Sequence, residues 1–167
     1  HSHGRALRRL RRHVQMISQD PYESLDSRFR VRDTVMEPLR IHNIGRNRAQ
    51  REEMACKALE RVGLSPAREY LARYPHELSG GQRQRVAIAA SIILEPDLIL
   101  ADEPVSMLDV SVRTGILELL SKLCAESGVG VLMITHDLST AAHYADLVAV
   151  MTAGLVVAPR PVGWSIA

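Results

Sequence analysis

The sequence has few aromatic residues and few cysteines, and each shortage argues against a class of function. Aromatic residues make up only 4% of the 167 residues, so a surface on which single-stranded nucleic acid could stack its bases is poorly supplied. The two cysteines, Cys56 and Cys124, lie far apart, with no Cys-x-x-Cys pair and no histidine at zinc-ligand spacing. This usage favours a reduced setting in which both thiols act as small apolar side chains. It also argues against any metal site other than one for Mg²⁺.

The chain also lacks a long apolar run and an excess of charge of either sign. No apolar stretch approaches the ~18 residues that a membrane-crossing helix needs. Lys and Arg number 21 against 19 Asp and Glu, a net charge of +2, so no strong overall field attracts nucleic acid. Residues 5–13 form a concentrated basic run. We interpret this run as the solvated face of a helix, and we expect no nucleic-acid partner.

Hydrophobic spacing indicates an α/β fold with a parallel sheet. Apolar residues recur at intervals of three and four through most of residues 33–73, which predicts several helices broken at Gly45 and Gly63. The other predicted elements are strands over 13–18, 97–102, 129–135, 146–151 and, weakly, 155–157, and helices from 80 to about 95, over 110–127 and over 138–145. Because long crossovers join successive main strands, these strands are expected to be parallel.

Reactive side chains follow two of the predicted strands directly. Asp102 and Glu103 end the strand over 97–102, and His136 follows the strand over 129–135. In open α/β sheets the ligand lies at the carboxyl ends of the strands. Side chains of these types can hold hydrated Mg²⁺, orient or deprotonate a water, and contact a phosphate during transfer. The alternative is that the acidic pair is only a helix cap or a solvated loop.

The segment from Ser79 to Gln82 begins a predicted helix and allows two interpretations. Gly80 and Gly81 permit close approach of a ligand to the backbone, and the free N–H groups of a helix N-terminus can bind a phosphate. Ser-x-x-Gln is also a capping box, with Ser79 as the N-cap and Gln82 as the third helical residue. The two interpretations are compatible.

Five segments resemble the sequence motifs of ABC transporter ATPases, in the family's order and at its spacing. The matches are LSGGQ at 78–82 with the signature sequence, LILADEP at 98–104 with the Walker B strand, SMLD at 106–109 with the D-loop, ITHD at 134–137 with the switch-histidine segment, and Gln19 with the Q-loop glutamine. The resemblance covers about residues 5–157. Flanking sequence, such as QDPY at 19–22 and RYPHE at 73–77, is similar to the ATPases of dipeptide, oligopeptide and nickel importers.

The resemblance implies a partial P-loop NTPase fold, in which an all-helical subdomain is inserted into an ATPase core with a parallel sheet. The implied parts are residues 1–32, the end of the N-terminal core with the Q-loop; 33–95, the helical subdomain with the signature helix; 96–158, the core with Walker B, D-loop and switch histidine; and 159–167, an irregular tail. The implied function is ATP hydrolysis, with ATP and Mg²⁺ as cofactors, that energises uptake of peptides or nickel. The implied location is peripheral, at the cytoplasmic face of the cell's inner membrane.

The resemblance also implies a role for each matching residue. Glu103 would be the general base and His136 the contact to the γ-phosphate. Asp102 would position Mg²⁺ through water, and Gln19 would help to ligate Mg²⁺ or water and link the site to the membrane subunit. The residues implied to close over ATP held by a second ATPase subunit are Ser79, Gly80, Gly81 and Gln82, with Asp109 crossing the same interface. The implied partners are that second subunit, in a homo- or heterodimer, integral membrane permease subunits and, indirectly, a substrate-binding protein.

One motif of the family does not occur in this sequence. No Gly-x-x-x-x-Gly-Lys-Ser/Thr is present, and that loop supplies a backbone cradle for phosphates and a hydroxyl on Mg²⁺. We therefore expect that this polypeptide by itself neither binds ATP tightly nor hydrolyses it, and that missing strands leave apolar surface uncovered. Two alternatives stand beside the importer ATPase: a non-enzymatic remnant of a broken ABC ATPase gene, and a soluble ABC ATPase of DNA repair or translation. The second alternative is disfavoured, because the sequence has no zinc motif, long insertion or tandem domain.

Overall fold

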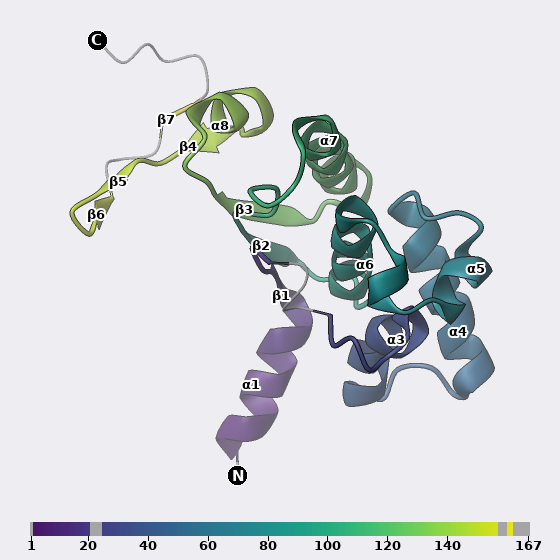
Figure 1. Ribbon diagram of the computed structural model, residues 1–167. Coiled ribbons are helices and arrows are strands. Elements are labelled where there is room, and N and C mark those ends of the chain that lie inside the picture. Colours follow the sequence, from purple (N-terminus) through teal and green to yellow (C-terminus); the bar gives the residue numbers. More distant parts are fainter. Residues whose placement is uncertain (1, 21–24, 157–159, 162–167) are drawn as a thin grey trace. The chain divides into compact units, whose positions relative to one another are not determined.

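The computed structural model describes residues 2–20, 25–156 and 160–161, and it consists of two compact units (Figure 1). The first unit is His1–Ile134 and the second is Thr135–Ala167. The first holds a parallel sheet and most of the helices, and the second holds one short helix and short antiparallel strand pairs. None of the described helices is both long enough and apolar enough to cross a membrane.

Three parallel strands form the centre of the first unit. They are β1 (Val14–Ile17), β2 (Leu98–Asp102) and β3 (Gly130–Ile134), and they lie in the order β1-β2-β3. Met16 is paired with Leu100, which in turn is paired with Leu132, so all three strands run in the same direction and end at one edge. This pairing confirms the predicted α/β class with a parallel sheet. The strands can be parallel because the helices between them carry the chain from the end of one strand back to the edge where the next strand starts.

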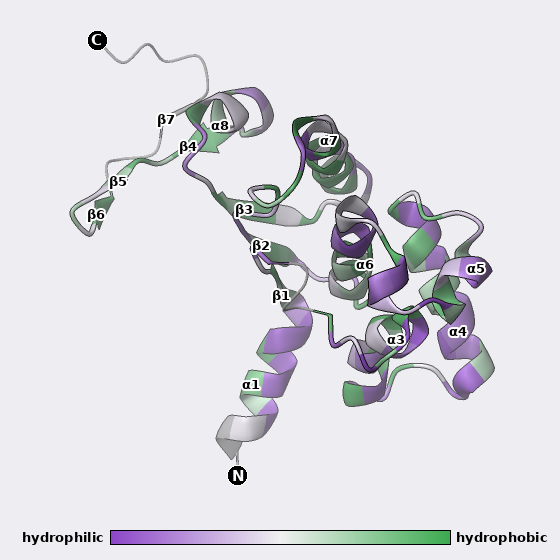
Figure 2. Ribbon diagram, viewed as in Figure 1, coloured by the Kyte–Doolittle hydropathy of each residue, from purple (hydrophilic) through white to green (hydrophobic). Residues whose placement is uncertain are grey.

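The two faces of this sheet differ in burial. Side chains alternate between the faces, and one face lies against helices α6 (Gly80–Ile92) and α7 (Val110–Ser127). The side chains buried there are those of Ile17, Ile99 and Ala101. The large apolar side chains exposed on the opposite face are those of Met16, Leu132 and Ile134, each 57% to 60% exposed. Figure 2 shows the strands mostly in the green of apolar residues. Uncovered apolar surface, as predicted, is therefore present on this face.

A group of helices lies between β1 and β2 in the sequence and packs around its own apolar core. Its elements are α3 (Val31–Ile41), α4 (Arg48–Arg61), α5 (Ala67–Ala72) and a 3-10 turn, η1 (Pro75–Glu77), which precede α6. The buried side chains recur at helical spacing, and they include Val31, Val35 and Leu39 of α3 and Ala55, Ala58 and Leu59 of α4. The helices predicted over 33–73 are confirmed by this arrangement.

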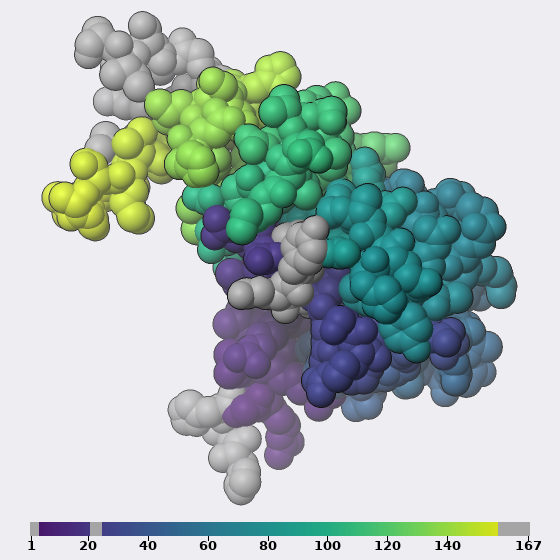
Figure 3. Space-filling model, in the orientation of Figure 1, coloured from purple at the N-terminus to yellow at the C-terminus, as the bar shows by residue number. Residues whose placement is uncertain are grey.

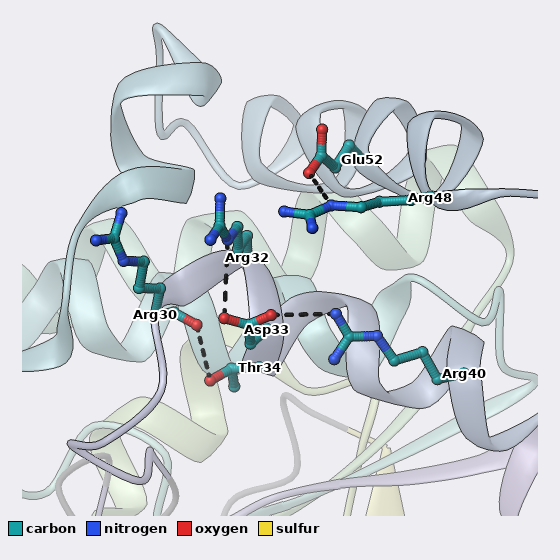
Figure 4. Close-up of polar contacts among 7 residues, drawn as sticks. All are labelled: Arg30, Arg32, Asp33, Thr34, Arg40, Arg48 and Glu52. Atoms are coloured by element: carbon teal, nitrogen blue, oxygen red, sulfur yellow. Dashed lines mark hydrogen bonds and ion pairs between the residues drawn. The ribbon is translucent and has the colours of Figure 1, made fainter.

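Ion pairs join charged side chains within α3 and within α4 (Figure 4). The Asp33 carboxylate accepts a hydrogen bond from Arg40 Nη2 at 3.1 Å, and its other oxygen lies 3.8 Å from Arg32 Nε. On α4, Arg48 Nε donates to Glu52 Oε1 at 3.0 Å, one helical turn away. Solvent-exposed pairs of this kind contribute at most about 1 kcal/mol each, so the apolar core and not these pairs holds the group together.

Helix α1 (Ser2–His13) leads into the first strand. All of its arginines are exposed, which confirms the interpretation of the basic run as a solvated helical face. Figure 3 shows the helix, in purple, standing out from the body of the first unit. Its last residue is anchored to the start of β2, because His13 Nδ1 lies 2.9 Å from Asp97 Oδ2 and the Asp97 N–H donates to the His13 carbonyl at 2.9 Å.

Four arginines of α1 and His42, which follows α3, line a shallow groove of about 520 Å³. These arginines are Arg5, Arg8, Arg9 and Arg12. The pKa of His42 is held below its ordinary value, first by burial and then by the positive charges of Arg8 and Arg12. Both effects penalise the charged imidazolium, so they favour the neutral form of His42.

The second unit agrees with the sequence prediction only in part. Helix α8 (Leu138–Tyr144) matches the predicted helix over 138–145. The predicted strand over 146–151 is wrong in extent: β4 (Leu147–Val148) pairs antiparallel with β7 (Arg160–Pro161), and β5 (Met151–Thr152) pairs antiparallel with β6 (Leu155–Val156). The predicted strand is interrupted at residues 149 and 150, because β4 and β5 pair with different strands. The turn at Ala153 and Gly154, with φ angles of 48° and 78°, joins β5 to β6.

Two predictions at the end of the chain fall partly outside the described residues. The weak strand predicted over 155–157 corresponds to β6, and residue 157 is not described. The tail predicted as irregular over 159–167 contains β7, so the prediction is wrong at Arg160 and Pro161. Residues 159 and 162–167 lie outside the described part of the chain.

Candidate functional site

Gln19 and Glu103 meet at the carboxyl ends of β1 and β2. Gln19 lies two residues beyond the end of β1, and Glu103 directly follows β2. Gln19 Nε2 donates a hydrogen bond to Glu103 Oε2 at 3.1 Å, although the two residues are 84 positions apart in the sequence. Side chains that follow neighbouring parallel strands come together because those strands end at the same edge of the sheet. The structure thus places two of the predicted site residues in direct contact.

The backbone of Glu103 adopts a conformation that residues with a side chain rarely take. Its φ angle is 42°, in the left-handed region, which costs a residue other than glycine about 1–3 kcal/mol. Its N–H donates to the carbonyl of Ile134 at 2.9 Å, and its carbonyl accepts from the N–H and the hydroxyl of Ser106, each at 3.1 Å. Ile134 of β3 holds the N–H of Glu103, and Ser106 holds its carbonyl. These backbone contacts therefore fix the direction in which the Glu103 side chain points.

Asp102 is the last residue of β2, and it lies in different surroundings from Glu103. It pairs with Ile134 in the sheet, and by the alternation of side chains it shares a face with Leu100 and Met16. Its side chain is half-buried on that face. Among the described residues, no group of three or more His, Cys, Asp or Glu side chains is placed to hold a metal ion. Two adjacent carboxylates in separate surroundings are suited to different tasks.

Ser79 and Gln82 form the predicted capping box at the start of α6. The Gln82 N–H donates to Ser79 Oγ at 3.3 Å, and the Ser79 N–H donates to Gln82 Oε1 at 3.0 Å. Gln82 Nε2 also donates to the hydroxyl of Tyr70 on α5 at 3.4 Å. The capping interpretation is therefore confirmed. A cap of this kind leaves the N–H groups of Gly80 and Gly81, at the positive end of the helix dipole, without intrahelical acceptors.

Asp109 stands at the N-cap position of α7, and its side chain makes no capping hydrogen bond. The residue is exposed. The loop before it is held by Arg113, whose Nε donates to the Leu108 carbonyl at 2.7 Å and whose Nη2 donates to the Ser106 carbonyl at 3.3 Å. Arg113 could not be predicted from the sequence, because its partners are backbone carbonyls that no residue pattern marks.

His136 belongs to the second unit, whereas the other predicted site residues belong to the first. It is exposed, and it directly precedes Asp137, the N-cap of α8. Asp137 Oδ1 accepts from the N–H groups of Ser139 and Thr140, and Oδ2 accepts from the Thr140 hydroxyl at 2.7 Å. These bonds hold the pKa of the Asp137 carboxyl below its ordinary value, with the Thr140 hydroxyl as the largest cause. The turn that carries His136 is thus held by the cap that follows it.

Replacing Asp137 with alanine is expected to lower the thermal stability of the second unit, because α8 loses its N-cap. A carboxyl whose folded pKa is lowered stabilises the fold above its ordinary pKa, and it loses that effect as the pH falls through the lower folded value. The wild type should therefore lose more stability than Asp137→Ala between neutral and acid pH. Thermal melts by circular dichroism measure both effects. Asp137→Asn, which keeps a capping oxygen, is the matched control, and an unchanged melt for the alanine variant would contradict this role.

The structure therefore forms two clusters in the first unit: Gln19 with Glu103 at the sheet edge, and the start of α6 with the loop before α7. Residues 1–106 of the sequence match the family model described as ABC transporter. This match covers more than half of the 167 residues, so the chain belongs to the ABC transporter family.

Two relatives show which members of the family the sequence is similar to. The chain is 48% identical over 158 residues to the glutathione import ATP-binding protein GsiA of Pectobacterium atrosepticum, a match that covers 95% of this chain and 25% of that protein. It is 45% identical over 154 residues to the oligopeptide transport ATP-binding protein OppF of Streptococcus mutans, covering 92% and 49%. The chain thus spans between a quarter and a half of the length of these two relatives.

Solved structures of the family share the fold. The ATP-binding cassette MJ0796, in a dimeric post-hydrolysis state bound to ADP and Pi, superimposes with a TM-score of 0.77 at 29% identity, over 93% of this chain and 66% of that one. CbiO1 from Clostridium perfringens, part of the ABC transporter complex cbiONQ, gives a TM-score of 0.78 at 30% identity, over 90% and 58%. The predicted resemblance and the predicted fold class are confirmed by these matches together with the family match.

Proposed function

We propose that this chain is part of the ATP-hydrolysing subunit of an ABC importer that takes up peptides or small peptide-like solutes. The observation that supports this most directly is the hydrogen bond from Gln19 to Glu103 at the carboxyl ends of β1 and β2. It brings an amide and a carboxylate together where α/β folds bind their ligands. The similarity to oligopeptide and glutathione import proteins supports the substrate class.

Glu103 is proposed as the general base for the attacking water. β3 and Ser106 hold the backbone of Glu103 in place, and Gln19 fixes the Oε2 atom of its carboxylate. An ionised carboxylate can accept several hydrogen bonds at once, including one from a water. A base held in this way needs little reorganisation when the proton is transferred.

Asp102 and Gln19 are proposed to take part in Mg²⁺ binding. Gln19 donates to Glu103 through its amide nitrogen, which leaves its amide oxygen available as a ligand, and the half-buried Asp102 ends the same strand that Glu103 follows. Amide and carboxylate oxygens suit Mg²⁺, which keeps several waters and takes few protein ligands besides phosphate. Bound Mg²⁺ would neutralise charge on the phosphates of ATP.

The remaining site residues are proposed to act at an interface with a second ATPase subunit. Ser79, Gly80, Gly81 and Gln82 would offer the N-terminus of α6 to ATP held by that subunit. The exposed Asp109 would lie at the same interface, and His136 would contact the γ-phosphate in its own subunit. The dimeric state of the MJ0796 structure supports such an arrangement.

The helical part over 33–95 is proposed to dock on integral membrane permease subunits at the cytoplasmic face of the inner membrane. A substrate-binding protein would deliver the solute on the other side. The division of the chain at 1–32, 33–95, 96–158 and 159–167 stays a prediction, and it underlies this proposal. The cbiONQ complex that contains CbiO1 supports an ATPase subunit working with other subunits.

Transport by the purified native complex tests the proposal. The complex is reconstituted in vesicles with ATP inside or outside, and uptake of labelled oligopeptide and of labelled glutathione is measured. We expect uptake of one of these solutes only when ATP faces the ATPase subunits. A complex that moves neither solute but moves Ni²⁺ would change the substrate class, and a complex that binds no ATP would overturn the function.

A further inference from the structure

Three glycines lie where α6 faces α7 and the loop before it, and at one of them the two helices approach closely. A Cβ atom on Gly80 would lie 3.5 Å from Leu108 Cδ2, and one on Gly81 would lie 2.5 Å from Val112 Cγ1. A Cβ on Gly115, one turn further along α7, would lie 3.4 Å from Arg85 Nη2. We call these three pairs the α6–α7 contact. It joins the helix start that carries Ser79 to the segment that carries Asp109.

The tightest pair in this contact is Gly81 with Val112. A separation of 2.5 Å is shorter than real Cβ atoms tolerate, so an alanine at position 81 requires the Val112 side chain or one of the two helices to shift. Val112 is β-branched and lies in the first turn of α7, where its side chain has little rotational freedom. Gly81 is not among the described residues with positive φ, so its backbone conformation alone does not require glycine. What requires glycine here is the methyl group of Val112.

Arg85 holds the other side of α6. Its Nη1 donates to the carbonyl of Val62 at the end of α4 at 2.5 Å, and its Nη2 faces Gly115 on α7. The same guanidinium therefore spans from the helical group to α7. Because α6 is held on both sides, a change at the Gly81–Val112 pair is expected to displace the start of α6 and not its whole length.

We propose that Val112 is a positioning residue, whose side chain sets the place of the α6 N-terminus relative to Asp109, so that residues 79–82 and Asp109 move as one element. The consequence for catalysis rests on the proposed function, in which both segments meet the partner's ATP. Gly81 then has a second role besides leaving room for a ligand: it receives the Val112 side chain of its own chain.

A double-variant experiment separates these roles. The native ATPase assembly is made with Gly81→Ala, with Val112→Ala and with both, and kcat and KM for ATP are measured. We expect Gly81→Ala to lower kcat about tenfold with little change in KM, because the helix start is misplaced. In the double variant the two Cβ atoms would be 3.8 Å apart, an ordinary contact, so most of the lost kcat should return. Gly81→Ala with Val112→Thr keeps a branched side chain and should stay impaired.

A distance measurement tests the positioning without any catalysis. Cys56 and Cys124 are replaced, spin labels are placed at Ser79→Cys and Asp109→Cys, and the distance between them is measured in the same variants. We expect Gly81→Ala to shift or broaden the distance distribution and the double variant to restore it. If this distance does not respond, or if the double variant is as slow as Gly81→Ala, the inference is wrong and position 81 needs glycine only for the ligand. If the distances respond as expected but neither the wild type nor any variant hydrolyses ATP, the proposed function is wrong. The inference that Val112 positions the start of α6 then still holds.

Discussion

ATP turnover is expected to stop when Glu103 is replaced with glutamine, while ATP binding by the native subunit persists. Glutamine has nearly the same size as glutamate, and its side-chain oxygen can still accept the hydrogen bond that Gln19 donates to the carboxylate in the wild type. It cannot take a proton from water, so the loss falls on the chemical step. General bases contribute about 10²–10⁴-fold to the rate, and we expect a loss of at least that size. Steady-state phosphate release and equilibrium binding of ATP measure the two effects separately.

The control for this variant is Glu118→Gln, which makes the same chemical change at an exposed position on α7. It should leave both turnover and binding unchanged. Hydrolysis near the wild-type rate in Glu103→Gln would remove Glu103 as the base and would leave Asp102 as the next carboxylate to test. Loss of ATP binding together with turnover would instead mean that Glu103 holds the site together.

A bulky side chain at position 79 is expected to impair turnover at the nucleotide held by the partner subunit. In Ser79→Trp the indole would cover the N–H groups at the start of α6, which are proposed to face that nucleotide. Displacing a reacting group by about 1 Å can cost 10²-fold in rate, so a loss of about that size is expected. Turnover is measured in mixed assemblies in which only one subunit carries the variant.

Two outcomes distinguish this interface role from a local effect on the helix. Ser79→Ala removes the capping hydroxyl without adding bulk, so it should cost α6 about 1 kcal/mol of stability and leave turnover much closer to wild type. If Ser79→Trp leaves the rate of the mixed assembly unchanged, or if both variants are equally slow, the start of α6 does not act on the partner's nucleotide.

The sequence was sufficient for the parts of this fold that depend on regular patterns. The apolar run over 97–102 and the helix over 110–127 were predicted because an uninterrupted apolar run and helical spacing are clear local signals. The capping box at Ser79 was predicted because its four residues act locally. The expectation that reactive groups gather at strand ends required only that the strands be parallel.

Other features depend on distances that no local pattern encodes. The Ile134 carbonyl and Ser106 hold the backbone of Glu103 in its left-handed conformation. A glutamate in the sequence does not indicate such a conformation, which is more typical of glycine. The two glycines after Ser79 indicated close approach of a ligand, but Val112 of the same chain also occupies that space. The strand pair of β4 and β7 was missed because each strand is only two residues long, too short for an alternating pattern to show.

The left-handed conformation of Glu103 also bears on how this protein can evolve. Glycine would adopt the same φ of 42° without the steric cost, so Glu103→Gly relieves this strain while it removes the carboxylate and its hydrogen bond with Gln19. Laboratory selection for heat resistance alone would therefore act on the backbone strain and not on the carboxylate at this position. In the proposed function, glutamate is kept at this position by selection for the reaction and not by selection for the fold.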